Sequence, residues 1–204
     1  TGTVVVWADG NGKAGMVGED GKPNREVASL LDSGISVIAA DLLYQGEFLK
    51  EGETLTTQRL ASTTSRQIPA YTYGYNNSLF VQRVHDLLTL ISFVANDEHG
   101  TKNIVLVGAN GAGPIAATAR ALVGNAVHTA IVDTAGFRFG EITRFNDVNF
   151  LPGAIKYGDL PGILALNAPH RLIVVGEDIP AFTKAIYDAA EARVKSAKSI
   201  YEAF

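Results

Sequence analysis

Cysteine is absent from the 204 residues. Its absence excludes disulfide bonds, thiolate metal sites and cysteine nucleophiles. The cellular compartment stays open, because secreted proteins also exist without cysteine. Basic charge is scarce as well, since 17 Lys and Arg residues stand against 21 Asp and Glu, for a formal net charge of −4. This balance, with a pI near 5.5, excludes the basic surface that nucleic acid or an anionic membrane attracts, so we expect neither partner.

Long apolar runs are missing too. None approaches the ~20 residues of a membrane-spanning helix, and the start has no signal-type segment. The first residue is Thr1 rather than an initiator methionine, so we expect a processed chain or a piece of a longer protein. The composition is globular, with 47% hydrophobic and 19% charged residues. It predicts one domain over residues 1–204 that buries roughly 70% of the surface its unfolded chain exposes.

Short β-branched runs alternate with helical patterns along the chain. We expect strands at residues 3–7, 35–40, 104–107, 127–132 and 171–175, and helices at 23–31, 78–96, 114–122, 160–166 and 181–203. The stretch 44–75 is polar, Thr-rich and without clear periodicity, and its length predicts a functional excursion. Apolar strands separated by helices are typical of a parallel sheet that is covered on both faces.

The predicted fold class is α/β, a three-layer sandwich around a five-stranded parallel sheet in the order 2-1-3-4-5. In this order the loops after the first and third strands face each other across a crevice. These loops are Gly10-Asn11-Gly12 and the Gly-rich turn at 108–113. A ligand site is therefore expected between them.

The Gly-rich turn has two interpretations. In the first, Gly108, Gly111 and Gly113 hold a dinucleotide pyrophosphate at a helix N-terminus, and Asp133 binds the ribose. The spacing G-x-x-G-x-G and the position after the third strand both depart from that fingerprint. In the second, residues 108–112 form the nucleophile elbow of an α/β-hydrolase, with Asn110 at the nucleophile position. An amide has no ionisable proton for a general base to take and is a very poor nucleophile, so serine-type acyl transfer is not available.

Segments in a characteristic order along the chain carry a family resemblance. They are Val4–Trp7 with Asp9-Gly10, Ser33–Asp41 with Gln45-Gly46-Glu47, Tyr73–Asn76 with Arg83–Asp86, the turn at 108–113, Leu151–Gly153, Tyr157–Pro161 and Ala168–Leu172. In this order the chain resembles the α/β-hydrolase superfamily, in its acetyl xylan esterase-like and dienelactone hydrolase-like branch. The resemblance implies a carboxylic ester hydrolase fold, a carbohydrate ester as ligand and no cofactor. It also slightly favours a secreted or periplasmic location.

The resemblance implies a damaged catalytic triad. The nucleophile position holds Asn110, Asp178 matches the triad acid, and no histidine follows His170. The chain also begins at the equivalent of the family's third strand and stops before its last, so the predicted fold is truncated. Asn11 and Gly12 fit the oxyanion-hole position. Without a nucleophile that position is at most a binding pocket, for which we expect Asn11, Gly12 and Gly111 as ligand-binding residues.

Other candidate residues have simpler structural explanations. The four histidines have no metal-ligand spacing, and His99, His128 and His170 precede strands, away from the edge where ligands collect. Aspartates at strand ends, such as Asp9 and Asp41, commonly accept bonds from loop amides.

Two further groups lie in and before the helix at 78–96. Arg83 and Asp86 are expected to tie that helix to a loop. Tyr71, Tyr73 and Tyr75 alternate in a predicted extended loop, where they either cover the sheet edge or line a sugar-binding rim.

Three functional hypotheses remain. The first is an inactive hydrolase-fold domain that serves a larger protein by structural support of a catalytic partner domain or by ligand binding in the crevice. The second is an active ester hydrolase that another domain completes. The third is a Rossmann-like nucleotide-binding domain.

Overall fold

The protein is described by a computed structural model that covers residues 2–50, 52–61, 64, 66–98 and 100–201. Its sheet has five parallel strands in the order β2-β1-β3-β4-β5. The strands are β1 (Thr3–Asp9), β2 (Ser36–Ala39), β3 (Asn103–Ala109), β4 (Thr129–Asp133) and β5 (Arg171–Val175). The predicted order is confirmed. β1 is an interior strand, paired with β2 on one side and β3 on the other.

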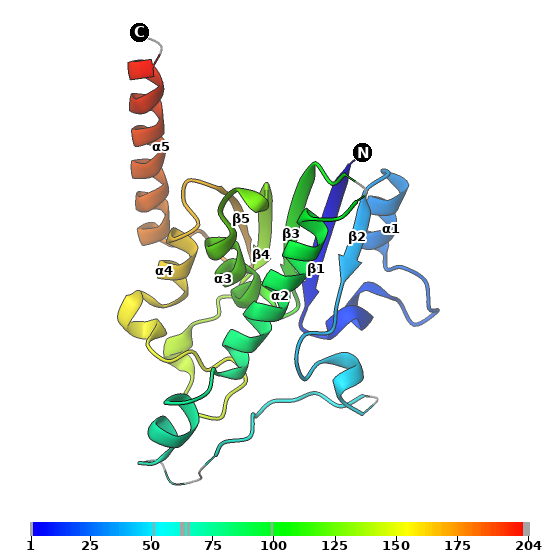
Figure 1. Cartoon of the computed structure of the whole chain (residues 1–204), viewed down its shortest axis with the longest axis vertical. Helices are drawn as coiled ribbons and strands as arrows, with labels where there is room; N and C mark the ends of the chain where they lie inside the picture. The colour runs from blue at the N-terminus through cyan, green and yellow to red at the C-terminus, as the bar shows by residue number, and fades with distance from the viewer. Residues whose placement is uncertain (1, 51, 62–63, 65, 99, 202–204) are drawn as a thin grey trace.

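The sheet is flanked by helices. They are α1 (Arg25–Asp32), α2 (Leu79–Ala95), α3 (Gly113–Val123), α4 (Asp159–Ala165) and α5 (Ala181–Tyr201). α2 and α3 lie side by side on one face of the sheet (Figure 1). Along the sheet, the connection from β1 to β2 runs one way, and the connections from β2 to β3, β4 and β5 run the other way. Because both kinds of crossover are right-handed, α1 lies on the face opposite to α2 and α3.

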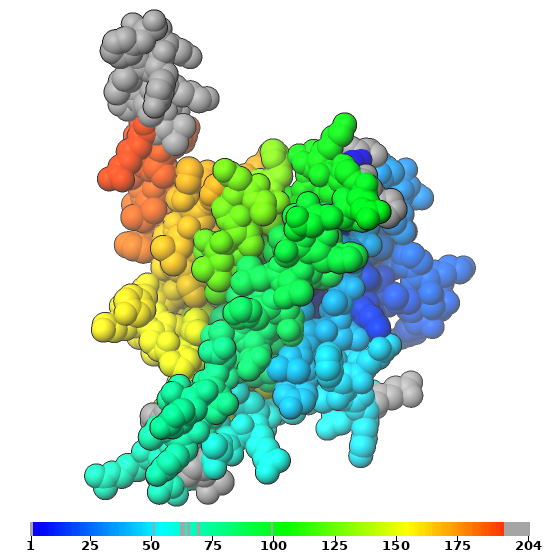
Figure 2. Space-filling model, in the orientation of Figure 1, coloured from blue at the N-terminus to red at the C-terminus, as the bar shows by residue number. Residues whose placement is uncertain are grey.

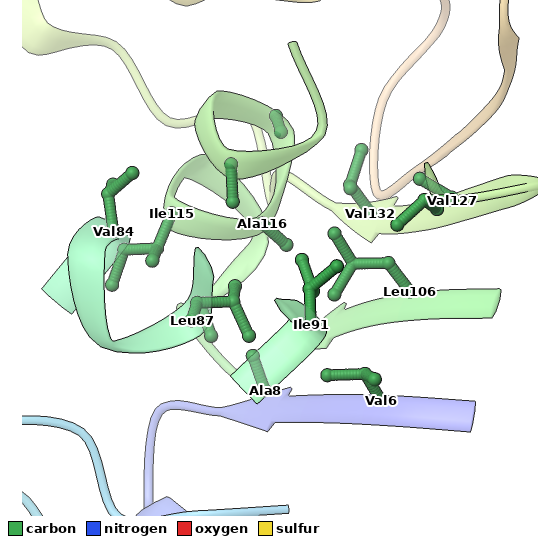
Figure 3. Close-up of a cluster of buried hydrophobic side chains, with 14 of the residues drawn as sticks. Val6, Ala8, Val84, Leu87, Ile91, Leu106, Ile115, Ala116, Val127 and Val132 are labelled. Carbon is green, nitrogen blue, oxygen red and sulfur yellow. The ribbon is translucent and has the colours of Figure 1, made fainter. Parts of the chain in front are cut away.

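The hydrophobic core lies between the sheet and the helices α2, α3 and α4. Val6 and Leu106 point from the strands toward Leu87 and Ile91 of α2 and Ile115 of α3 (Figure 3). All five side chains are at most 2% exposed. Alternate residues of β1 and β3 supply this layer, because successive side chains of a strand point to opposite faces.

The second face of the sheet is partly exposed at β5. α1 contacts β2, whereas α5 packs on α4 and extends away from the body of the molecule (Figure 1). Ile173 and Val175 of β5 are therefore 38% and 47% exposed. Helices flank the sheet as predicted, and the direction that α5 takes leaves β5 less covered than the interior strands.

Local capping explains where the helices begin and end. Asn24 caps α1 by accepting a bond from the Val27 amide, so the helix begins after Pro23 rather than at it. Ser78 caps α2 in the same way, and Asn96 ends that helix, as predicted.

The excursion at 44–75 contains a 3-10 turn (Gly46–Phe48) and a π-helical turn (Pro69–Tyr73). The expected alternation of tyrosines in an extended loop is therefore wrong. Tyr73 packs its ring on Phe150 with 5.1 Å between centroids, and its hydroxyl donates to the Phe145 carbonyl. Tyr71 and Tyr75 are exposed.

Of the helices in the described part of the chain, none is both long and apolar enough to cross a membrane.

Candidate functional site

The turn between β3 and α3 has the backbone geometry of a nucleophile elbow. Asn110 sits at its tip with φ of +50°, a left-handed conformation that is uncommon for residues other than glycine, asparagine and aspartate. The loop after β1 touches this turn: a Cβ on Gly10 would lie 1.8 Å from the Asn110 carbonyl oxygen. Only glycine allows so close an approach, so the two Gly-rich loops converge as the sequence predicted.

The side chain of Asn110 is held by a buried carboxylate. Its Nδ2 donates to Asp9 Oδ2 at 2.8 Å, across a sequence separation of 101 residues. Asp9 is 2% exposed and also accepts from the Asn11 amide at 2.9 Å and from Trp7 Nε1 at 3.4 Å. Three neutral donors therefore surround this carboxylate. The expected oxyanion-hole donor, the Asn11 N–H, is one of them and is already occupied.

A second aspartate fixes the loops beside the elbow. Asp41, which follows β2, accepts from the amides of Lys13 and Glu47. Lys13 Nζ lies 3.5 Å from Asp41 and 2.7 Å from Glu47, and these contacts raise the pKa of Lys13, Glu47 being the main cause. Gly12 is buried against Asp41, where a Cβ would lie 2.2 Å from Oδ1. Gly12 thus belongs to the loop support rather than to the cavity lining.

Arg83 and Asp86 tie α2 to the loop after β2, as expected from the sequence. The Leu43 amide donates to Asp86, while Arg83 donates to the carbonyls of Leu43 at 3.0 Å and Tyr44 at 3.1 Å. Burial lowers the pKa of Arg83, and nearby Asp86 opposes that shift. Gln45 completes the support by donating to the Gly10 carbonyl.

These loops enclose a cavity of about 1150 Å³ at the carboxyl edge of β1, β2 and β3. Asn110, Gly111 and Asn11 line it together with Lys13, Asp41, Tyr44, Arg83 and Asn149, and apolar side chains such as Met16 and Ile115 complete its wall. Residues 44–55 supply much of the lining. The excursion predicted to be functional therefore builds the site, and the space-filling view places this light-blue segment beside α2 (Figure 2).

Asp178, which the family resemblance matched to the triad acid, lies away from the cavity. Asp178 is exposed and does not line the cavity. Its neighbour Glu177 turns inward instead and accepts from Thr134 Oγ1 at 2.6 Å and from both Nη atoms of Arg138. The hydrogen bond from Arg138 lowers the pKa of Glu177 despite its partial burial. Sequence reasoning missed this pair, and the adjacent Thr134-to-Arg138 segment gave no motif that would have revealed it.

The described histidines lie away from the cavity. His85 is on the exposed side of α2, and His128 and His170 precede β4 and β5. His99 falls outside the described residues. Burial, and then the charge of Arg120, lower the pKa of His170. Asp133, the candidate ribose ligand, accepts from the Ala135 amide and does not line the cavity.

The cavity wall combines polar, charged and apolar residues. Its asparagines supply side-chain amides, Lys13, Asp41 and Arg83 are charged, and Met16 and Ile115 are apolar. Such a mixed wall is typical of a site for a polar organic ligand. Within the described ranges, no three His, Asp or Glu side chains gather as a metal-binding group.

The comparison with solved structures agrees with the predicted fold. No protein-family model and no curated protein sequence matches the chain. Among solved structures, it is similar to the crystal structure of a proposed acetyl xylan esterase from Bacteroides fragilis NCTC 9343, with 14% identity and a TM-score of 0.53. The match covers 93% of this chain and 56% of the other, so the chain spans about half the length of that protein. The likeness supports an α/β-hydrolase-like fold for the chain.

Proposed function

We propose that the chain is a catalytically inactive α/β-hydrolase-like domain that works within a larger protein and binds a carbohydrate ester in its crevice. The single observation that carries this proposal is the hydrogen bond from Asn110 Nδ2 to Asp9. It occupies the side chain at the nucleophile position with a structural role. A hydrolase needs an ionisable nucleophile and a base there, and an amide held by a carboxylate is neither.

Ligand binding is supported by what the crevice retains. The cavity is large enough for several sugar units. Because Asn110 donates its amide nitrogen to Asp9, its amide oxygen is left as an acceptor at a position that lines the cavity. An acceptor suits a sugar hydroxyl, which donates a hydrogen bond.

Two assays on the parent protein test the proposal. We expect no hydrolysis of aryl acetates above background and no labelling by a fluorophosphonate. We also expect acetylated xylotetraose to bind by calorimetry and to be recovered intact. Turnover that Asn110→Ala abolishes would contradict inactivity, and absence of binding would contradict the ligand role.

A serine at position 110 restores a hydroxyl there. Its activity would show whether the protein lacks only a nucleophile or also a base. In Asn110→Ser, the nearest support for the side chain is Asp9, and a carboxylate is a much weaker base than the imidazole of a triad. We therefore expect Asn110→Ser to remain inactive toward aryl acetates and the fluorophosphonate. Steady turnover in this variant would identify Asp9 as a functioning base.

One observation favours a second candidate, an esterase that another domain completes. The turn between β3 and α3 keeps a positive φ at Asn110, the conformation expected at the tip of a nucleophile elbow. Under this candidate, a longer protein that contains the chain hydrolyses aryl acetates, and Asn110→Ala in it lowers that turnover. Turnover that is unchanged by Asn110→Ala would place the chemistry in the other domain and favour the first proposal.

A further inference from the structure

We infer that Tyr44 is the aromatic platform of the crevice, on which a pyranose ring of the ligand stacks. This inference rests on the proposed ligand-binding function and adds to it the residue that recognises the sugar ring. Tyr44 lines the cavity, and it remains 48% exposed although the loop that carries it is firmly held.

The backbone at Tyr44 is strained. Its φ is +58°, in the left-handed region that glycine, asparagine and aspartate tolerate best. A bulky aromatic residue there lowers the stability of the fold, and such outliers collect at ligand-binding and active sites. Among the non-glycine residues that the structure describes, the others with positive φ outside the elbow are Ala135 and Asp159, neither of which lines the cavity.

The surrounding structure enforces this conformation. Arg83, only 5% exposed, donates Nη2 to the Tyr44 carbonyl and Nε to the preceding carbonyl of Leu43. On the other side Gln45, 6% exposed, donates to the Gly10 carbonyl and accepts from the Leu42 amide. Two buried side chains are thus used to hold the peptide units around Tyr44 in place. The ring itself is left at the cavity surface.

The chemistry of the wall indicates the class of ligand. Asn110 and Asn149 offer side-chain amides, which pair with hydroxyl groups, and Tyr44 adds an aromatic ring. A pyranose presents hydroxyl groups at its rim and C–H groups on its face. It therefore matches an aromatic surface bordered by polar groups, in the way that rings stack on aromatic side chains elsewhere.

The test compares two properties of Tyr44 variants. Calorimetry with xylotetraose, acetylated and unesterified, measures binding, and thermal unfolding measures stability. We expect Tyr44→Gly to weaken binding at least about tenfold, a loss of about 1.4 kcal/mol, and Tyr44→Phe to bind like the parent. Since glycine tolerates the conformation, Tyr44→Gly should melt above Tyr44→Ala. Tyr44→Asn is a second variant without an aromatic ring that tolerates the same backbone.

Two control variants test separately the two effects of Tyr44→Gly, the relief of a positive φ and the loss of a tyrosine ring. Ala135→Gly relieves a positive φ, here +46°, away from the cavity. Tyr75→Gly removes an exposed tyrosine ring, 84% exposed and likewise outside the cavity. Neither should change binding.

The outcomes separate this inference from the proposed function. Binding by the parent that survives in Tyr44→Gly and Tyr44→Asn overturns the inference and leaves the function standing. Binding of unesterified xylotetraose that depends on Tyr44, without preference for the ester, supports the inference and contradicts the ester part of the function. No binding of either sugar by the parent overturns both. A melting temperature of Tyr44→Gly at or below that of Tyr44→Ala overturns the strain argument and the inference built on it.

Discussion

Replacing Asn110 by aspartate places a second carboxylate against Asp9. In the parent, Asn110 Nδ2 lies 2.8 Å from Asp9 Oδ2 and donates to it. In Asn110→Asp an oxygen takes the place of that nitrogen. At low pH the new carboxyl is protonated and still donates a hydrogen bond to Asp9. Once the new carboxyl is ionised, two carboxylates face each other, and Asp9 is buried.

The expected penalty follows from the separation of the charges. Two unit charges ~4 Å apart repel by about 4 kcal/mol at an effective dielectric constant of about 20. Repulsion raises the pKa of the introduced carboxyl in the folded state above its unfolded value. Between the unfolded-state and folded-state pKa values of that carboxyl, the folded state binds more protons than the unfolded state. Stability therefore falls as pH rises from about 4, by up to about 1.4 kcal/mol for each pH unit.

Urea unfolding between pH 3 and pH 8 provides the assay, with the parent and Asn110→Ala as references. Asn110→Ala removes one donor from Asp9, which costs about 1–3 kcal/mol. Asn110→Asp should match the parent near pH 3 and become the least stable of the three by pH 8. If its stability follows that of the parent across the whole range, the contact between Asn110 and Asp9 is not made in solution.

Three other substitutions test packing away from the elbow. Arg120→Met should change the free energy of unfolding by less than about 1 kcal/mol in urea unfolding, because it removes the bond from Nη1 to the Gly124 carbonyl together with two buried polar atoms, Nε and Nη2, that have no hydrogen-bond partner; a large loss of stability would contradict this. Arg138→Met should destabilise the protein at neutral pH but little below pH 4, because the lowered pKa of Glu177 contributes stability that is lost as pH falls; a loss of stability that does not vary with pH would argue against the ion pair. Gln58→Ala should cost about 2 kcal/mol, since its side chain donates to the Asp147 carbonyl and accepts from the Leu79 amide; unchanged unfolding would show that these bonds do not stabilise the loops.

Much of the fold was predictable because local signals and general rules agree. Ser78 and Asn96 mark the ends of α2 through capping, which involves only neighbouring residues. The order of strands follows from apolar runs, alternating helices and the handedness of crossovers. The direction of α5 was not predictable in this way. It depends on contacts with α4, such as the bond from Thr183 Oγ1 to the Pro161 carbonyl, which the helix's own sequence does not reveal.

Within the site, the sequence determined that two Gly-rich loops meet and that an asparagine lies at the tip of the turn between β3 and α3. Only the tertiary structure decided what the asparagine side chain does, because its partner Asp9 is 101 residues distant. It also decided that Glu177, rather than Asp178, turns inward. Thr134 and Arg138, 43 and 39 residues earlier in the chain, are the hydrogen-bond partners that hold Glu177 there. Sequence patterns report which residues are neighbours along the chain, whereas the chemistry of a site depends on which groups the fold brings within hydrogen-bond distance.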